Sequence, residues 1–400
     1  MSADAGHALP NARQQSGSVT IGIVAGEPSG DALGAALIRA VRERLPHARF
    51  VGIAGPRMQA AGCEPWFPLE KLSVAGLVEV LSRVPQILAL RRELLRKLLA
   101  ARVQLFIGVD APEFNLGVEA KLKRSGVRTM HFVSPSIWAW RRGRVHKIRR
   151  SVHRMLALFP FEIPLYEAAG VPVTFVGHPL ARDAAASGTR REARAQLKLS
   201  VGQPVFALLP GSRIAEIDAH SELLLKAAAE LHATRPDIRF LVPLATRATR
   251  DRFEAAIYRL GADALPLTIL YGHATDALRA ADVAIVASGT ATLEAALARC
   301  PHVIYYRVNP VTAYIVRRKL LLPYVGLPNI LAGRFVVPEL LQEDATVENL
   351  VQAAGNLYDD TVTRRRLETL FGGFGASLAA DTGRLAAEAV AVELRAAGIP

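Results

Sequence analysis

Cysteine is nearly absent from this sequence, whose 400 residues contain only Cys63 and Cys300. Two thiols this far apart provide neither a disulfide framework nor the spacing of a metal-binding set, which fits a reducing cytoplasm. Long hydrophobic runs are also missing, because no uncharged apolar stretch reaches the roughly 18 residues that a spanning helix needs. Residues 1–18 lack the basic segment and apolar core of a secretory signal, and we expect a flexible tail there. The sequence therefore predicts a cytoplasmic protein for which any membrane contact is peripheral.

Acidic residues are in deficit. The sequence has 36 Asp and Glu against 49 Lys and Arg, which gives a formal net charge of +13. This balance favours an anionic partner, which leaves nucleic acid, an anionic membrane surface and a phosphorylated substrate as candidates. The densest basic run, residues 141–150, has no interleaved aromatic residues and no recognisable nucleic-acid-reading module. Nucleic acid therefore ranks last among the three.

Short apolar runs rich in β-branched residues alternate with helix-patterned stretches along the chain, which predicts an α/β fold with mostly parallel sheets. A chain of 400 residues with a hydrophobic content of 51% is too large for one ordinary core. We therefore expect two doubly wound, Rossmann-like domains that face each other across a cleft. The small and polar residues 181–191 are interpreted as a linker. The expected parts are a tail at 1–18, an N-terminal domain at 19–183, a C-terminal domain at 184–375 and a C-terminal helix at 376–400, whose packing the sequence leaves open.

Polar loops follow several of the expected strands, and open α/β sheets bind their ligands at that end of the strands. In the N-terminal half, we expect three such loops to line one rim of the cleft: residues 27–31, 110–115 and 134–140. In the C-terminal half, residues 210–213 and 287–294 occupy equivalent places and are expected to line the opposing rim.

The loop at residues 287–294 has the pattern of a strand, a tight turn and a helix. Ser288 and Thr290 are good N-cap residues and Gly289 permits a close turn, so unpaired N–H groups should face one point. A phosphate fits at such a point, and Glu294 lies about one turn into the helix, within reach of a sugar hydroxyl. The pattern favours a nucleotide-sugar site, but many α/β domains have such junctions that bind nothing.

Six segments in order along the chain resemble the lipid-A-disaccharide synthase family: residues 25–31 (AGEPSGD), 107–115 (IGVDAPEFN), 134–140 (SPSIWAW), 176–180 (VGHPL), 209–213 (LPGSR) and 287–294 (ASGTATLE). Single pieces are weak signals, but six in order are far more specific than one glycine-rich loop. The resemblance extends from about residue 21 to residue 342, and Pro28 stands where the family more often has a small residue.

This resemblance implies an inverting glycosyltransferase of the GT-B type that acts in lipid A biosynthesis. The donor would be UDP-2,3-diacylglucosamine and the acceptor 2,3-diacylglucosamine 1-phosphate, giving a β-1,6-linked disaccharide 1-phosphate and UDP. Both substrates are anionic amphiphiles, which fits the basic charge. No cofactor is expected. The chain has no Asp-x-Asp motif, so we expect Arg213 and helix N–H groups, with no metal, to neutralise the departing UDP.

All of the expected site residues except Asn329 lie in the matched motifs. We expect the donor to contact Gly211, Ser212, Arg213, Ser288, Gly289, Thr290, Glu294 and Asn329. The residues expected on the acceptor side are Ser29, Asn115, Ser134, Ser136, Trp138 and His178. Trp138 and Trp140 are equally consistent with plain packing. His131 and His178, at strand ends with apolar neighbours, are more typical of satisfied core groups, although the family motif makes His178 a plausible neighbour of the site.

Asp110 is the first candidate for the general base, because it directly follows a buried strand on the acceptor side. The alternative is that Asp110 only caps the next turn, because Asp before Ala-Pro commonly starts a turn. Glu27 is the competing base and would otherwise orient the acceptor. Asp31 is interpreted as the N-cap of the helix that begins at Ala32.

Residues 74–100 are more apolar than a simple surface helix requires and also carry several arginines. They form either a buried helical hairpin or an exposed apolar face suited to the anionic cytoplasmic surface of the inner membrane. Such a face would favour lipid substrates over the soluble sugar of an epimerase. The alternative functions are a UDP-GlcNAc 2-epimerase, a transferase acting on peptidoglycan lipid intermediates and, last, a nucleic-acid-binding protein. Oligomerisation is left open.

Overall fold

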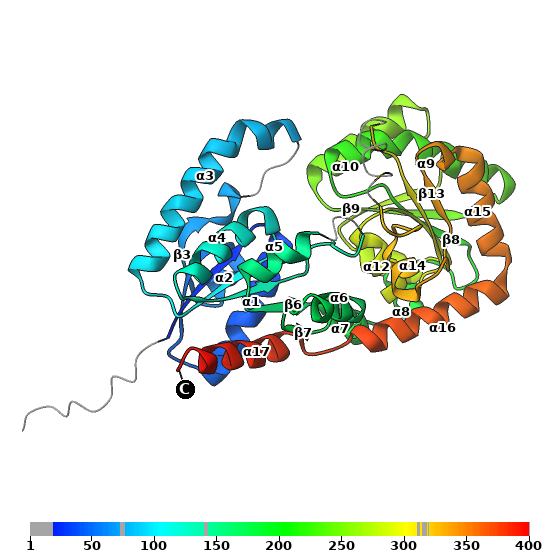
Figure 1. Ribbon diagram of the computed structural model, residues 1–400. Coiled ribbons are helices and arrows are strands. Elements are labelled where there is room, and N and C mark those ends of the chain that lie inside the picture. Colours follow the sequence, from blue (N-terminus) through cyan, green and yellow to red (C-terminus); the bar gives the residue numbers. More distant parts are fainter. Residues whose placement is uncertain are drawn as a thin grey trace, which may run out of the picture. The chain divides into compact units, whose positions relative to one another are not determined.

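The computed structural model describes residues 19–72, 77–139, 143–309, 313, 318 and 320–399, and the side chains of residues 77–83 are not described (Figure 1). The expected tail at 1–18 and Trp140, Arg141 and Arg142 lie outside these residues. The chain divides into two compact units. Unit 1 comprises residues 1–135, 143–176 and 381–400, and unit 2 comprises residues 136–142 and 177–380.

Unit 1 contains a parallel seven-stranded sheet in the order β3-β2-β1-β4-β5-β6-β7. Its strands are β1 (Thr20–Ala25), β2 (Arg49–Ala54), β3 (Cys63–Pro68), β4 (Leu105–Val109), β5 (Arg128–Phe132), β6 (Arg154–Ala157) and β7 (Val173–Phe175). Its helices are α1 (Pro28–Arg44), α2 (Pro56–Ala60), α3 (Leu77–Ala100), α4 (Pro112–Arg124), α5 (Arg144–Ser151), α6 (Ile163–Ala168) and α17 (Thr382–Ala396).

Unit 2 contains a parallel six-stranded sheet in the order β10-β9-β8-β11-β12-β13. Its strands are β8 (Val205–Leu209), β9 (Arg239–Leu244), β10 (Leu267–Tyr271), β11 (Val283–Ala287), β12 (His302–Tyr306) and β13 (Glu339–Leu341). Its helices are α7 (Pro179–Ala186), α8 (Arg190–Gln196), α9 (Ile214–Thr234), α10 (Arg247–Arg259), α11 (Ala274–Ala280), α12 (Thr290–Leu297), α14 (Leu327–Ala332), α15 (Val347–Asp359) and α16 (Thr361–Leu378). The expected fold class, α/β with two doubly wound sheets, is confirmed.

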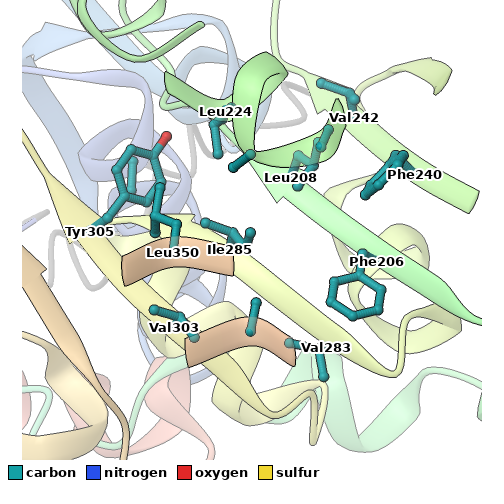
Figure 2. Packing of buried hydrophobic residues seen from close by; sticks show 14 of the residues in the cluster. Phe206, Leu208, Leu224, Phe240, Val242, Val283, Ile285, Val303, Tyr305 and Leu350 are labelled. Carbon is teal, nitrogen blue, oxygen red and sulfur yellow. The ribbon is translucent and has the colours of Figure 1, made fainter. Parts of the chain in front are cut away.

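The central strands are apolar throughout because helices cover both faces of each sheet. In β8, Phe206 and Leu208 face one hydrophobic cluster, while Val205, Ala207 and Leu209 face the other. Figure 2 shows the first cluster, in which Phe206 and Leu208 lie among side chains of β9, β11, β12 and α15. Side chains that alternate between two buried faces produce a continuous apolar run.

In both sheets the strand order reverses beside the first strand of the unit. β1 lies between β2 and β4, and β8 lies between β9 and β11. Ligands of open α/β sheets bind outside the carboxyl ends of the strands at such a switch point. The loops that follow β1 and β4 in unit 1, and β8 and β11 in unit 2, are those in which the sequence placed most of the expected chemistry.

Two sequence interpretations are corrected by the fold. Residues 181–191 are not an irregular linker, because they lie mostly in α7 and α8, and the Thr189 side chain accepts a hydrogen bond from the Glu192 N–H at the start of α8. Residues 74–100 do not form a hairpin, because α3 is one continuous helix with Pro85 inside it. The packing of the C-terminal helix, which the sequence left open, is with unit 1, where α17 lies beside α1 (Figure 1).

Candidate active site

The turn between β8 and α9 is shaped by Glu216. Its carboxylate Oε2 accepts hydrogen bonds from the backbone N–H groups of Ser212 and Arg213, at 2.8 and 3.2 Å. A Cβ atom on Gly211, whose φ is 120°, would lie 2.6 Å from the Glu216 Cβ. Glycine at this position therefore lets the loop fold back over the start of α9, and the side chains of Ser212 and Arg213 remain exposed.

The turn between β11 and α12 leaves the first N–H groups of the helix without partners. The N-cap residue is Gly289, with φ 152°, and no side chain caps the helix, so the expected N-cap roles of Ser288 and Thr290 are wrong. Among the described residues, the N–H groups of Gly289, Thr290 and Ala291 have no backbone or side-chain acceptor. Such uncapped N–H groups at the positive end of a helix dipole are suited to an anion.

Glu294 lies on the same face of α12 as Thr290, one turn further into the helix. The side chain is partly buried, and burial raises the pKa of its carboxyl. The carboxylate makes no hydrogen bond or ion pair with the part of the chain that the structure describes. A partly buried carboxylate with free acceptor positions can accept hydrogen bonds from ligand hydroxyl groups.

Two residues at the end of β12 hold the two turns of unit 2. Tyr306 donates its hydroxyl to Glu216 Oε1 at 3.1 Å, and the backbone O of Tyr305 accepts from the Ser288 N–H at 2.9 Å. His220 on α9 is buried, and its Nδ1 lies 2.8 Å from the carbonyl oxygen of Pro210. The sequence patterns did not identify Glu216, Tyr306 or His220 as residues that shape these turns. The available signal for Glu216 was its place three residues after the N-cap Arg213.

Asn329 uses all of its hydrogen-bonding capacity inside unit 2. Its side-chain Nδ2 donates to Val337 O at 3.0 Å and to Glu339 Oε1 at 2.8 Å. Its Oδ1 accepts the N–H groups of Val336 and Val337 at 2.7 and 3.0 Å. The residue is fully buried. An amide with two donors and two acceptors in use holds the segment between α14 and β13 in place.

In unit 1, Asp110 lies in a strained loop directly after β4. Asp110 and Ala111 both have left-handed backbone conformations, with φ of 53° and 42°. Each such residue costs about 1–2 kcal/mol relative to ordinary conformations, and strain of this kind concentrates at functional sites. The N-cap of α4 is Ala111, and the Asp110 carboxylate makes no hydrogen bond or ion pair with the described residues. The capping alternative for Asp110 therefore finds no support.

The loops after β1 and β4 are in direct contact. A Cβ atom on Gly26 would lie 2.5 Å from the Ala111 Cβ, so only glycine permits this approach. Glu27 and Asp110 flank the contact on their respective loops. Glu27 is exposed and, like Asp110, makes no hydrogen bond through its carboxylate with the described residues. Ser29 is exposed in the first turn of α1. The structure thus brings into contact the two loops that carry the carboxylates proposed from the sequence.

Asp31 does not cap α1, which begins at Pro28, so that interpretation is wrong. Its buried carboxylate caps α2 instead, because it accepts the backbone N–H groups of Gly55, Arg57 and Met58 at 2.9–3.1 Å. Asp31 is 3% exposed and is held away from solvent by these bonds. Asp31 therefore holds the start of α2, whereas the carboxylates of Glu27 and Asp110 have no hydrogen-bond partner among the described residues.

The other acceptor-side candidates are divided between the units. Ser134 lies in unit 1, with its hydroxyl 2.7 Å from the Tyr166 hydroxyl. Asn115 lies in the same unit and is buried on α4. Ser136, Trp138 and His178 belong to unit 2. The sequence alone did not separate these two groups.

His178 is the N-cap residue of α7. Its Nδ1 accepts the Leu180 N–H at 3.2 Å, and burial lowers the pKa of the imidazole to about 4. The ring is therefore neutral near pH 7 and serves the start of this helix. No group of three or more His, Cys, Asp or Glu side chains suited to a metal ion occurs among the described residues.

Comparison with known proteins assigns the chain to a family. A family model described as lipid-A-disaccharide synthetase matches residues 21–371. The lipid-A-disaccharide synthase of Dechloromonas aromatica is 50% identical over 374 residues, which cover 93% of this chain and 98% of that protein. The corresponding protein of Chromobacterium violaceum is 50% identical over 377 residues, with 94% and 98% covered.

Solved structures with lower identity share the fold. UDP-GlcNAc 2-epimerase from Neisseria meningitidis, bound to UDP-GlcNAc, has a TM-score of 0.57 at 11% identity and covers 95% of this chain and 99% of its own. Acinetobacter baumannii MurG has a TM-score of 0.55 at 15% identity, with 94% and 99% covered. These neighbours show the GT-B architecture alone. The family match and the relatives at 50% identity decide the assignment: the chain belongs to the lipid-A-disaccharide synthase family.

Proposed function

We propose that the chain joins UDP-2,3-diacylglucosamine to 2,3-diacylglucosamine 1-phosphate, giving the β-1,6-linked disaccharide 1-phosphate and UDP, a step of lipid A biosynthesis. Membership of the family supports this reaction. The observation that carries it is the chemistry at the two switch points. Unit 1 has two carboxylates without a hydrogen-bond partner among the described residues, and such a carboxylate can act as a general base. Unit 2 has an uncapped helix start whose free N–H groups can bind a diphosphate.

The donor UDP binds unit 2 in this proposal. Its pyrophosphate contacts the N–H groups of Gly289, Thr290 and Ala291, and the exposed Arg213 guanidinium neutralises the charge that develops as UDP leaves. Glu294 accepts hydrogen bonds from the ribose hydroxyls. Asn329 acts by holding the segment between α14 and β13. The side chain of Ser212, next to the close turn at Gly211, adds a hydroxyl donor.

The acceptor binds unit 1, and Asp110 takes the proton from its attacking hydroxyl. That hydroxyl has a pKa far above neutral, so attack on the donor carbon requires proton removal as the new bond forms. Glu27, on the adjoining loop, orients the acceptor. Ser29, Asn115 and Ser134 lie in the same unit and shape this side. The resemblance also assigns Ser136, Trp138 and His178 to the acceptor side, and these three residues lie in unit 2.

Peripheral association with the anionic inner membrane completes the proposal. In the second half of α3, Leu90, Leu94 and Leu98 pack in the core of unit 1. Nearer the start of the helix, Val84 is 39% exposed. The sequence there is apolar, with Leu77, Val78 and Leu81, and it is followed by several arginines, as a leaflet-binding face requires. None of the helices in the described part of the chain is both long and apolar enough to span a bilayer.

A turnover assay with purified protein tests the reaction. With both acylated sugars present, we expect release of UDP and formation of a disaccharide 1-phosphate. The mass of this product should equal the mass of donor plus acceptor minus the mass of UDP. A 2-epimerase would convert UDP-GlcNAc without an acceptor, and a peptidoglycan transferase would require a lipid-linked muramyl acceptor. Turnover of either of those substrates, with no disaccharide from the acylated pair, would contradict the proposal.

A further inference from the structure

The strained loop at Asp110 is clamped from α4 by Asn115. The buried Asn115 amide donates through Nδ2 to the Asp110 carbonyl oxygen at 2.8 Å. The same Nδ2 lies 3.4 Å from the carbonyl oxygens of Val24 and Val109, at the ends of β1 and β4. A single side chain thus ties both strands of the switch point to the residue proposed as the base. A displacement of α4 relative to β4 would therefore move Asp110.

A buried pair lies one turn further along α4. Glu119 and His131 are both 0% exposed, and His131 Nδ1 lies 2.7 Å from Glu119 Oε1. The pair crosses from α4 to β5, next to Gly108 of β4. A Cβ atom on Gly108 would lie 2.2 Å from Glu119 Oε1 and 2.7 Å from the Asn115 Cβ. Glycine at position 108 therefore makes room for the pair and the clamp together.

This pair is a poor source of stability. Three buried atoms in the cluster have no hydrogen-bond partner among the described residues: Asn115 Oδ1, Glu119 Oε2 and His131 Nε2. Burial raises the pKa of the Glu119 carboxyl, with His131 acting in the opposite direction. Apolar residues of similar volume often replace buried ion pairs without loss of stability. A role in positioning the neighbouring elements explains the cluster better than a role in stability.

We infer that Glu119 and His131 are positioning residues that fix α4 against β5 and thereby, through Asn115, hold Asp110 in its reactive place. β5 also bonds the loop directly, since the carbonyl oxygen of Phe132, next to His131, accepts the Asp110 N–H at 2.8 Å. The pair thus joins the helix that holds the Asp110 carbonyl to the strand that holds its N–H. This inference rests on the proposed role of Asp110 as the base.

The test replaces Glu119 in the full-length enzyme. Glu119→Leu fills the space without the bond to His131, and we expect kcat to fall about 10- to 100-fold because a misplacement of about 1 Å has that effect. KM for both substrates should stay nearly unchanged. Glu119→Gln keeps a polar partner for His131 and should restore most of the lost turnover. Glu167→Gln, an exposed carboxylate on α6, is the matched control for loss of charge.

A double-mutant comparison separates positioning from general damage. If Glu119 acts through Asp110, Glu119→Leu should have no further effect on kcat in an Asp110→Asn background. If the two substitutions act independently, the fold-losses in kcat should multiply in the double variant. A folded Glu119→Leu enzyme with parental kcat, or an equal loss in both backgrounds, overturns the inference while Asp110 remains the base. An Asp110→Asn enzyme that keeps its activity removes the base assignment, and the inference with it. If Glu119→Leu does not fold, His131→Gln carries the same expectations.

Discussion

Replacing Arg213 by Ala should slow turnover while leaving the fold and donor binding nearly intact. The Arg213 side chain is 75% exposed, and its only ion pair is a contact of 3.7 Å with Glu216 among the described residues. An exposed pair of this kind contributes at most about 1 kcal/mol. Glu216 holds the turn through the backbone N–H of residue 213, which Ala retains. A cation aimed at the departing diphosphate contributes about 2–4 kcal/mol to the transition state, so kcat should fall by about 30- to 1000-fold.

UDP release at saturating acceptor measures this loss, and calorimetry with UDP measures ground-state binding on the same preparation. Arg247→Ala is the matched control, since that arginine is 90% exposed on α10 and has a similarly loose pair with Asp251 at 3.9 Å. A kcat near the parental value would refute the reasoning. So would a loss of UDP affinity as large as the loss of turnover, because the contact would then be equal in ground and transition states.

Three further results are expected. Glu294→Gln should weaken UDP binding in calorimetry but raise the melting temperature of the free protein at neutral pH. Because burial raises the folded-state pKa of Glu294 above its usual 4.5, this stability gain should be complete above the folded pKa and shrink as the pH falls through it; a gain that grows at low pH would contradict this. Asp31→Ala leaves three N–H groups of the α2 region unpaired and should lower the free energy of unfolding by about 1–3 kcal/mol in urea denaturation; an unchanged midpoint would refute it. Combined replacement of Leu77, Val78 and Leu81 by Ser should reduce sedimentation with anionic vesicles at low salt, and equal sedimentation of a folded variant would remove the membrane proposal.

The positions of the loops that carry both candidate sites could be predicted because local patterns determine them. Parallel strands that are buried on both faces have continuous apolar sequences. The loops that bind ligands follow the carboxyl ends of these strands. This placed Asp110 and Glu27 on neighbouring loops, and Arg213 and Gly289 at the other switch point. The helices at residues 181–191 were also within reach, since Ala-rich sequence favours helix and Thr189 with Glu192 has the capping-box spacing.

Long-range partners were beyond the sequence. Asp31 looked like a cap for its own helix, yet its acceptors bind N–H groups at residues 55–58, on another element. The pairing of Glu119 with His131 depends on the register of α4 over β5, which no local pattern encodes. The role of Tyr306 depends likewise on β12 lying beside β11. Local signals predict where a turn lies, and tertiary packing decides which side chains hold it.

The central claim is that Asp110 removes the proton from the acceptor hydroxyl. Turnover and UDP affinity of Asp110→Asn and Glu27→Gln, measured on the same preparations, test it most directly. Asn keeps the shape of the side chain without its basicity, so we expect an Asp110→Asn enzyme that binds UDP normally and turns over about 10²- to 10⁴-fold more slowly, with a mild loss in Glu27→Gln. An Asp110→Asn enzyme within about tenfold of the parent, together with a large loss in Glu27→Gln, would contradict the account and assign the base to Glu27.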